Sequence, residues 1–388
     1  MINKIVYFRY LPLTEKVYRD FYMQEIIDAG FDVEYWYLPF VISVPSGIEY
    51  YNNGCVKIVS SYKELNKRLK HEDKEHTLFI SIQTYTWSVL RLFWVMSRNK
   101  CKLSVFGKNM IPTPFKAKAS SILQCSPSLI VKRILNRLAL FLKKCGVVKS
   151  YEVLFISGQM GVNAYGYRTS REIHISKHIL INGDDYDRAM SLKSGMRILE
   201  DNYIVFIDTC LPLHPDLKIC NMDAMNPDVY YKELNLFFDK IEKETGLKVV
   251  IAAHPKALIY KEKDFFEGRN VIYGKTAELI RDSELVLFHN STSIGYAVCF
   301  DKPIISMVST SLREGQRDTF ESSLCFSEEL DTRLVFIDDY CNNNHSGICN
   351  ELSINREAYD RYKYRYLTNP NTENINSSYL VIQGLKSL

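Results

Sequence analysis

Short apolar runs that alternate with helical segments are the feature that most constrains how this chain can fold. In its first part, such runs are followed by segments in which apolar residues recur at helical spacing. Helices are expected at Glu15–Ala29 and Trp87–Met96. The expected strands are Ile5–Phe8, Val33–Leu38, Thr77–Ile82, Leu103–Phe106 and Glu152–Ile156. This alternation predicts parallel strands joined by helical crossovers, and therefore an α/β fold.

The same alternation starts again near Tyr203. The expected strands are Tyr203–Ile207, Val249–Ala253, Val271–Tyr273, Leu285–Phe288 and Ile304–Val308. The expected helices are Asp228–Thr245, Thr276–Asp282 and Ile294–Phe300. The restart indicates a second Rossmann-like domain, which agrees with the length of 388 residues. We expect one domain over 1–190, a second over 200–350, and a helical tail over 355–388 that packs back across both.

Several features indicate a cytoplasmic location. The ten cysteines include no Cys-x-x-Cys pair, so zinc ribbons and redox motifs are not expected. No export signal precedes the first strand, and the best apolar run is short and is interrupted by Arg91. We therefore expect reduced cysteines and no membrane-spanning helix.

The charge of the chain is distributed unevenly. Between Glu75 and Glu152 there is no acidic residue, whereas this window holds thirteen Lys and Arg. Since the whole chain has a net charge of +4, the remainder carries 4 − 13 = −9. One segment is therefore strongly basic and the rest is acidic.

A helix with basic residues is expected inside this window, between Pro127 and Gly146. Its apolar residues recur at helical spacing, and basic residues fill much of the rest. One interpretation is a surface helix with a solvated charged face. The other is a helix that lies on the anionic inner face of the cytoplasmic membrane. No nucleic-acid motif accompanies the segment, so nucleic acid is not an expected partner. The candidate lipid-contacting residues are Lys132, Arg133, Arg137, Lys143 and Lys144.

Polar side chains follow two strands of the second domain. The strand Val249–Ala253 ends on a His-Pro-Lys sequence, and the strand Leu285–Phe288 ends on His-Asn-Ser-Thr-Ser. Ligands of open α/β sheets bind outside the carboxyl ends of strands, where His, Lys and hydroxyl groups can contact phosphate. Either element alone fits a buried histidine or a helix cap, but together they indicate a phosphate site. Its candidate residues are His254, Pro255, Lys256, His289, Ser291, Thr292 and Ser293.

These motifs resemble those of a known enzyme class. His254-Pro255, followed by a strand, by Ser291-Thr292-Ser293 and by Lys302-Pro303, is similar to the pattern of bacterial GT-B glycosyltransferases of surface-polysaccharide synthesis. In sialyltransferases of this type, the His-Pro motif and a Ser/Thr pair hold the CMP of the donor, and Kdo transferases are similar. Teichoic acid glycerophosphotransferases, which use CDP-glycerol, carry a similar arrangement. The resemblance implies a GT-B type fold, with two Rossmann-like domains facing a central cleft, and a donor phosphate at His254 and Ser291–Ser293.

The general base is not identified by the resemblance, because the acidic motif of the sialyltransferases has no counterpart here. Asp208 follows the first strand of the second domain, and His214 lies in the same loop, so both are candidate catalytic residues. Asp184, Asp185 and Asp187 form a third acidic group, and Asp185-Tyr186-Asp187 also matches a metal-binding Asp-x-Asp pattern. We nevertheless expect no metal and no other cofactor, since the cationic and hydroxyl groups at the phosphate can stabilise the leaving group.

The sequence thus predicts a glycosyltransferase with a nucleotide-sugar donor. The donor expected first is a CMP-linked nonulosonic acid or Kdo, and the acceptor is a glycan or a lipid-linked glycan. A CDP-glycerol-type glycerophosphotransferase is one alternative, and a non-catalytic nucleotide-binding assembly module is another.

Overall fold

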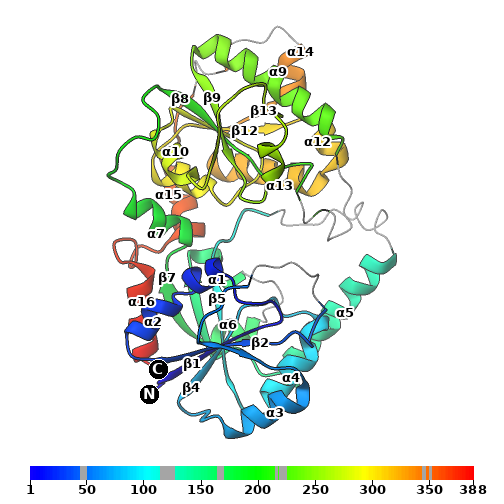
Figure 1. Cartoon of the computed structure of the whole chain (residues 1–388), viewed down its shortest axis with the longest axis vertical. Coiled ribbons are helices and arrows are strands. Elements are labelled where there is room, and N and C mark those ends of the chain that lie inside the picture. The colour runs from blue at the N-terminus through cyan, green and yellow to red at the C-terminus, as the bar shows by residue number, and fades with distance from the viewer. Residues whose placement is uncertain are drawn as a thin grey trace. The chain divides into compact units, whose positions relative to one another are not determined.

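Two separate parallel β-sheets organise the chain in the computed structural model (Figure 1). The structure describes residues 1–43, 50–113, 127–163, 170–214, 217, 225–342, 347–348 and 352–388. The first unit consists of Met1–Met110, Ala117–Asp184 and Thr368–Leu388, and the second of Ile111–Lys116 and Asp185–Leu367.

The sheet of the first unit has seven strands in the order β3-β2-β1-β4-β5-β6-β7. Every pairing within it is parallel. The strands are β1 (Lys4–Arg9), β2 (Asp32–Tyr37), β3 (Val56–Ile58), β4 (Thr77–Ser81), β5 (Lys102–Gly107), β6 (Val153–Ser157) and β7 (Lys177–Ile181).

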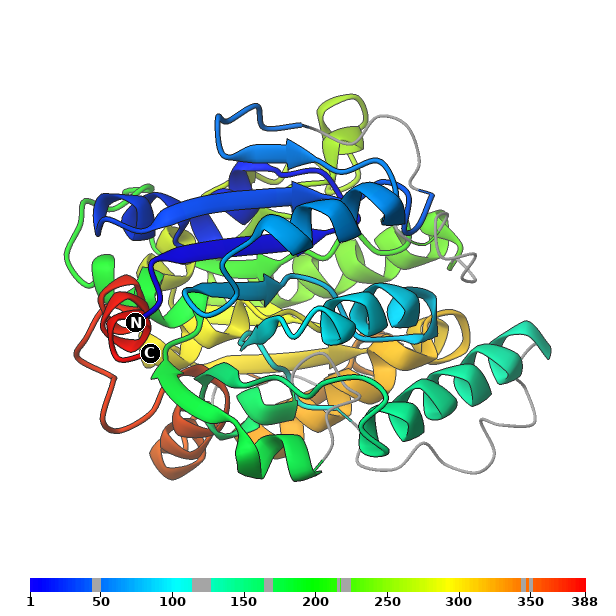
Figure 2. The same cartoon turned by 90° about the horizontal axis from the view of Figure 1, so that it is seen from below.

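Helices cover both faces of this sheet, as the view from below shows (Figure 2). Ile5 and Tyr7 of β1 belong to one apolar cluster, whereas Val6 and Phe8 belong to the other, as alternation along a strand requires. The first cluster is completed by α1 (Glu15–Asp20), α2 (Met23–Asp28) and α16 (Ser377–Lys386). The second is completed by α3 (Tyr62–His71), η1 (Trp87–Val89), α4 (Leu90–Arg98) and α5 (Pro127–Lys144).

The predicted helix Glu15–Ala29 is wrong in one respect, because it is divided into α1 and α2. Tyr22 has a left-handed backbone with φ of 57°, which a helix cannot continue through. The buried hydroxyl of Tyr7 donates a hydrogen bond to the carbonyl of Phe21 at 2.8 Å. The break therefore leaves a carbonyl that accepts a hydrogen bond from the buried hydroxyl of β1, which helical periodicity does not reveal.

The end of the chain belongs to the first unit from Thr368 onward. Asn182, directly after β7, donates through Nδ2 to the carbonyls of Thr372 and Ile375, and its Oδ1 accepts from the hydroxyls of Thr368 and Thr372. The helix α16 then packs on β7 and α2. One buried amide thus connects the last strand of the sheet to a segment almost two hundred residues later.

The sheet of the second unit has six strands in the order β10-β9-β8-β11-β12-β13, again with parallel pairings only. The strands are β8 (Tyr203–Ile207), β9 (Lys248–Ala253), β10 (Val271–Tyr273), β11 (Leu285–Phe288), β12 (Ile304–Val308) and β13 (Arg333–Phe336). The helical elements of the second unit are α7 (Asp184–Ser191), α9 (Pro227–Thr245), η4 (Leu258–Lys261), α10 (Thr276–Asp282), α11 (Ile294–Cys299), α12 (Thr310–Gly315), α13 (Arg317–Leu330), α14 (Ile337–Asn342), α15 (Arg356–Tyr362) and η5 (Lys363–Leu367). The first unit also contains η3 (Gln159–Asn163) and α6 (Ser170–Ile175).

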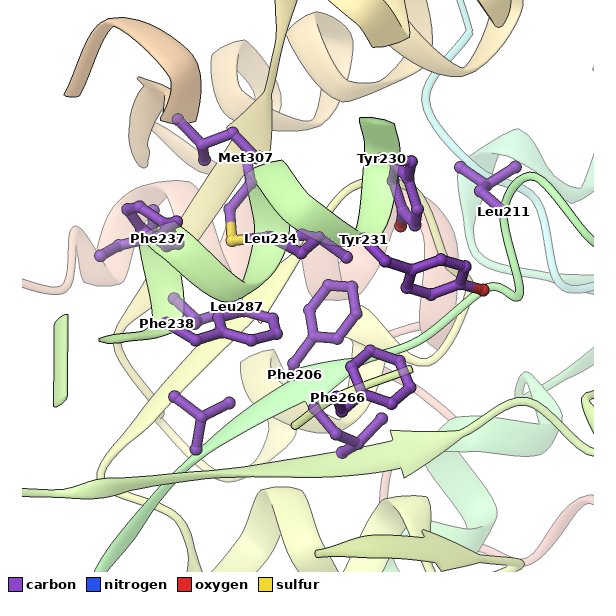
Figure 3. Packing of buried hydrophobic residues seen from close by; sticks show 14 of the residues in the cluster. Phe206, Leu211, Tyr230, Tyr231, Leu234, Phe237, Phe238, Phe266, Leu287 and Met307 are labelled. Carbon is purple, nitrogen blue, oxygen red and sulfur yellow. The ribbon is translucent and has the colours of Figure 1, made fainter. Parts of the chain in front are cut away.

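The core of the second unit is aromatic and lies under α9. Figure 3 shows Tyr230, Leu234 and Phe238 of this helix together with Phe206 of β8 and Leu287 of β11. The ring centroids of Phe206 and Phe238 are 5.3 Å apart. Asn226 begins the helix by accepting from the N–H of Asp228, and Gly246 ends it in a left-handed conformation. The side of α9 that faces the sheet is therefore apolar and buried.

The predicted fold class of two Rossmann-like α/β sheets is confirmed. The sequence did not predict β3, β7 and β13, which lie at the edges of their sheets. Edge strands need not be buried on both faces, and β3 and β7 lack the continuous apolar runs of the inner strands. Among the described residues, no helix combines the length and the apolar character needed to cross a bilayer.

Candidate functional site

Three neighbouring strands of the second unit end on the residues that the sequence singled out. Asp208 follows β8, His254 follows β9, and His289 follows β11. Since β9, β8 and β11 are adjacent and parallel, their carboxyl ends lie at one edge of the sheet. The position of these residues is therefore the one at which open α/β sheets bind ligands.

Asp208 is buried and connects three segments of this edge. Its Oδ1 accepts from the N–H of Cys210 at 2.9 Å and from the hydroxyl of Tyr260 at 3.2 Å. Its Oδ2 accepts from the N–H of His254, also at 3.2 Å. One carboxylate thus joins the end of β8, the end of β9 and the turn η4.

Burial raises the pKa of Asp208 to about 6, although the hydrogen bonds from the N–H groups of Cys210 and His254 act in the opposite direction. The side chain is only 3% exposed, and its oxygens already accept three hydrogen bonds. The sequence suggested a carboxylate that faces a ligand, whereas the structure places it beneath the loop. This geometry suits a residue that holds His254 in place.

His254 and His214 lie against each other at the surface of this edge. Their ring centroids are 4.8 Å apart, and both residues are partly exposed. Nδ1 of His254 accepts from the N–H of Lys256 at 3.2 Å, so the proton of the neutral ring is on Nε2. The structure therefore brings together the rings of two candidate residues that the sequence assigned to different roles.

Tyr260 and Tyr231 belong to the same site, although no sequence motif indicated them. The two hydroxyls are 2.9 Å apart, and that of Tyr260 donates to Asp208. Tyr231 therefore donates to Tyr260, which gives a chain of buried hydroxyl groups that ends on the carboxylate. Tyr260 lies in a short turn and Tyr231 on α9, so only the folded chain brings them beside Asp208.

His289 was predicted to contact the donor phosphate, and the structure corrects this expectation. Its ring is 1% exposed and packs against Phe206 and Tyr230, with centroids 5.7 and 5.8 Å away. Nδ1 donates to the carbonyl of Met307 at 2.6 Å. Burial lowers the pKa of His289 to about 4, so the ring is neutral. His289 therefore connects β11 to β12 below the surface.

The segment Ser291–Ser293 lies between β11 and α11. The hydroxyl of Ser291 accepts from the N–H of Ser293 at 3.2 Å, whereas the side chain of Ser293 makes no hydrogen bond to the helix start. Ser291 therefore forms a turn within the segment, and the expected cap of α11 by a Ser or Thr side chain at Ser293 is not formed. The helix α11 has six residues. Thr292 is exposed, and Ser291 and Ser293 are partly exposed, so these hydroxyls lie at the same sheet edge as His254.

The remaining residues of the predicted motifs divide into surface and structural positions. Pro255 and Lys256 are exposed directly after His254. Lys302, in contrast, donates to the carbonyl of Ser283 at 2.7 Å, and burial lowers its pKa. Gly295 of α11 is closely packed, since a Cβ there would approach Cδ2 of Leu367 to 2.9 Å.

The acidic group at 184–187 begins α7, at the boundary between the two units. Asp184 belongs to the first unit, where its oxygens bind Nζ of Lys108 at 2.5 Å and Nδ2 of Asn109 at 2.7 Å. Asp185 and Asp187 belong to the second unit. Across the part of the chain that the structure describes, no three His, Cys, Asp or Glu side chains gather in a way that could hold a metal ion.

The five candidate lipid-contacting residues all lie on α5, but one of them points inward. Lys132, Arg133, Arg137 and Lys144 are exposed. Lys143 is buried and pairs with Glu172 at 2.6 Å, and its Nζ lies 3.9 Å from the ring centroid of Tyr151. The structure therefore removes Lys143 from the predicted surface group, because a side chain in this pair cannot reach lipid.

Comparison with solved structures agrees with the fold deduced from the two sheets. A structure of the wall teichoic acid polymerase TagF, obtained after a soak with CDPG, matches with a TM-score of 0.52 at 12% identity over 99% of this chain and 89% of that chain. UDP-GlcNAc 2-epimerase from Methanocaldococcus jannaschii matches over the full length of both chains at 13% identity, with a TM-score of 0.47. No protein-family model and no curated protein matches the sequence. At these identities the likeness concerns the fold, which is of the GT-B type.

Proposed function

We propose that this chain transfers a sugar from a cytidine nucleotide donor, with a CMP-linked nonulosonic acid or Kdo as the first candidate. The observation that carries the proposal is the ending of three adjacent parallel strands on Asp208, His254 and the His289–Ser293 segment. The likeness to the GT-B fold supports the same interpretation. The acceptor is a glycan or a lipid-linked glycan of a surface polysaccharide.

The exposed groups of this edge are assigned to the donor phosphate. Nε2–H of His254, the ammonium of Lys256 and the hydroxyls of Thr292 and Ser293 supply donors for phosphate oxygens. A hydrogen bond to a charged group contributes about 1.5–3 kcal/mol, so a few of them give micromolar binding, near −8 kcal/mol. Asp208 is assigned to positioning, because it binds the backbone of His254 and is itself buried.

The proposed reaction is a displacement at the anomeric carbon. The acceptor oxygen forms the new bond to that carbon while the bond from the carbon to the donor phosphate oxygen breaks, and CMP leaves with the bonding electrons. His214 accepts the proton of the acceptor hydroxyl, since it is partly exposed and lies beside His254. The donors around the phosphate stabilise the charge that grows on the leaving group.

The same assignment predicts transfer without a divalent metal. His254 and Lys256 can supply the positive charge and hydrogen-bond donors with which a magnesium ion would otherwise neutralise the phosphate. We expect the transfer rate in excess EDTA to equal the rate with added magnesium. Loss of activity in EDTA that manganese or magnesium restores would contradict this part of the proposal, and would direct attention to Asp185 and Asp187.

A CDP-glycerol-type glycerophosphotransferase is the second candidate, and the likeness to TagF over 99% of the chain favours it specifically. Both reactions release CMP, so nucleotide release alone cannot distinguish them. Mass spectrometry of the product does, because glycerophosphate transfer leaves a phosphodiester in the acceptor and sugar transfer leaves a glycosidic bond. Cytidine nucleotide binding without turnover for either donor would indicate an assembly module.

The central test of the phosphate site is His254→Ala. Removal of one donor from such a site lowers kcat by about 10²–10³-fold. The matched control is His71→Ala, which removes an exposed histidine at the end of α3 in the other unit. Activity near the wild-type level in a folded His254→Ala protein would contradict the assignment, whereas His71→Ala is expected to retain full activity.

A further inference from the structure

The helix α5 is oriented in an unusual way. The side chains that it turns toward its own unit include Asn136 and Lys143, both buried. Oδ1 of Asn136 accepts from the N–H of Trp87 at 3.0 Å, and the hydroxyl of Tyr85 donates to the carbonyl of Ala139 at 2.9 Å. Polar contacts and one buried ion pair therefore hold this helix in place together with the buried Ala139 of the apolar cluster.

Five large apolar side chains of α5 point the other way and are exposed, whereas Leu135 and Leu142 are partly buried. Ile134 and Phe141 are each 58% exposed. The full set is Ile130, Val131, Ile134, Leu138 and Phe141. At 3.6 residues per turn they fall within an arc of about 100°. This is an apolar row of the width that a helix normally buries.

Three exposed basic residues form one border of this row. Arg133, Arg137 and Lys144 follow each other at spacings of four and seven, so they fall within an arc of about 40° directly beside the apolar side chains. The apolar row and the basic border extend over the same length of helix. No acidic residue occurs between Glu75 and Glu152, so no neighbour in sequence neutralises this border.

Figures 1 and 2 show the course of α5. In both views the amino-terminal half of α5 stands away from the sheet of its own unit. The exposed indole of Trp87, which is 36% accessible, belongs to the turn that holds Asn136. An apolar row with basic residues at its edge is the composition of a helix that lies in the headgroup region of a bilayer.

We propose that α5 binds an anionic lipid surface by inserting its apolar row between the headgroups, with Arg133, Arg137 and Lys144 on lipid phosphates. The buried pair of Lys143 with Glu172 fixes the rotation of the helix that exposes the row. This inference is independent of the proposed transfer reaction, because it concerns a different unit and a different ligand. It would nevertheless bring the protein to the surface where a lipid-linked acceptor is located.

The test is co-sedimentation of the full chain with vesicles, without any nucleotide. Vesicles of phosphatidylcholine with about one third phosphatidylglycerol should bind the protein, and pure phosphatidylcholine should bind it much more weakly. Each basic residue near an anionic surface contributes about 1 kcal/mol. The triple variant Arg133→Gln, Arg137→Gln and Lys144→Gln should therefore lose at least about tenfold in affinity.

The apolar row is tested by a matched pair of leucines. Leu138→Glu places a charge in the row, whereas Leu236→Glu makes the same change at an exposed position of α9, where the side chain is 51% accessible. We expect Leu138→Glu to lose at least about tenfold in vesicle binding and Leu236→Glu to leave it unchanged. Equal effects of the two variants would overturn the proposal, as would wild-type binding that ignores lipid charge.

Two other occupants of the row would give different results. If a second copy of the chain covered it, sedimentation would show a wild-type dimer that Leu138→Glu dissociates, with no vesicle binding. If the basic border bound nucleic acid, an RNA oligonucleotide would compete with the vesicles for the protein. Leu138→Glu would then bind RNA as tightly as the wild type. Either result contradicts the lipid assignment. Circular dichroism of each variant confirms that a loss of binding is not a loss of fold.

Discussion

Two long amphipathic helices, α5 and α9, use their apolar sides in opposite ways. In α9, Leu234, Phe237 and Phe238 are fully buried against the sheet of the second unit. In α5, Leu138 and Phe141 are exposed, while Asn136 and Lys143 are buried. The two helices are of nearly equal length, with 18 residues in α5 and 19 in α9.

The difference shows that the periodicity of apolar residues identifies a helix but not the partner of its apolar face. For α9 that partner is the apolar core of the second unit, through aromatic contacts such as Phe206 with Phe238. For α5, the buried Glu172 requires a cation, and Lys143 supplies it. A charge left unpaired in the interior costs far more than an exposed leucine, so the ion pair determines the rotation of the helix.

The largest contrast is expected between two phenylalanines. Phe238→Ala should lower the free energy of unfolding by about 4 kcal/mol, because it leaves a cavity in a packed core. Phe141→Ala should change it by less than about 0.5 kcal/mol, since the ring is already exposed. Urea unfolding of the two variants measures both values. Comparable losses would mean that the outer face of α5 is packed in solution, which contradicts the comparison.

Two adjacent lysines test what holds α5. Lys143→Ala should destabilise the protein by about 3 kcal/mol, because it leaves Glu172 buried without its cation. Lys144→Ala, one residue further along the same helix, removes an exposed charge and should have almost no effect on stability. Thermal unfolding in low and high salt distinguishes them. If Lys143→Ala were as stable as Lys144→Ala, the ion pair would not fix the orientation of α5.

A smaller effect on the free energy of unfolding is expected in the second unit. There, α9 covers the neutral His289, whereas in the first unit α5 covers the ion pair of Lys143 and Glu172. The folded state lowers the pKa of His289 to about 4 from about 6.5, so its contribution to stability is present above pH 6.5 and is lost as the pH falls toward 4. Relative to His289→Gln, the wild type should lose about 2 kcal/mol between pH 8 and pH 5.

The measurement compares the free energy of unfolding of the wild type with that of His289→Gln, because Asp208 in both proteins makes stability depend on pH in the opposite direction. Its folded pKa of about 6 is raised, so its contribution is present below its unfolded pKa and is lost as the pH rises through 6. Parallel stability curves for wild type and His289→Gln across this range would show that His289 is not held neutral.

The inner strands could be predicted from the sequence because they are buried on both faces and therefore read as continuous apolar runs. Tyr203–Ile207 and Leu285–Phe288 have the bounds that the sequence predicted. The edge strand Lys177–Ile181 could not be found in this way, since three of its five side chains are exposed. The position of the last twenty-one residues in the first unit also depends on Asn182, a single amide without a sequence signature.

The candidate site was predicted in position more successfully than in role. His254 and Asp208 do lie together at strand ends, because parallel topology places those ends at one edge. Whether a side chain there faces solvent or the core cannot be read from the sequence. That distinction separates the partly exposed His254 from the buried His289, and it assigns Asp208 to positioning.

The sequence by itself determined the α/β class, the two sheets and the strand ends that carry the polar residues, because these follow from local periodicity along the chain. Only the tertiary structure decided which face of α5 is turned outward, which histidine is accessible and which tyrosines reach Asp208. Those outcomes depend on contacts between residues far apart in sequence, such as Lys143 with Glu172 and Tyr260 with Asp208. The cost of burying an unpaired charge or donor selects them, and that cost exists only once the chain has folded.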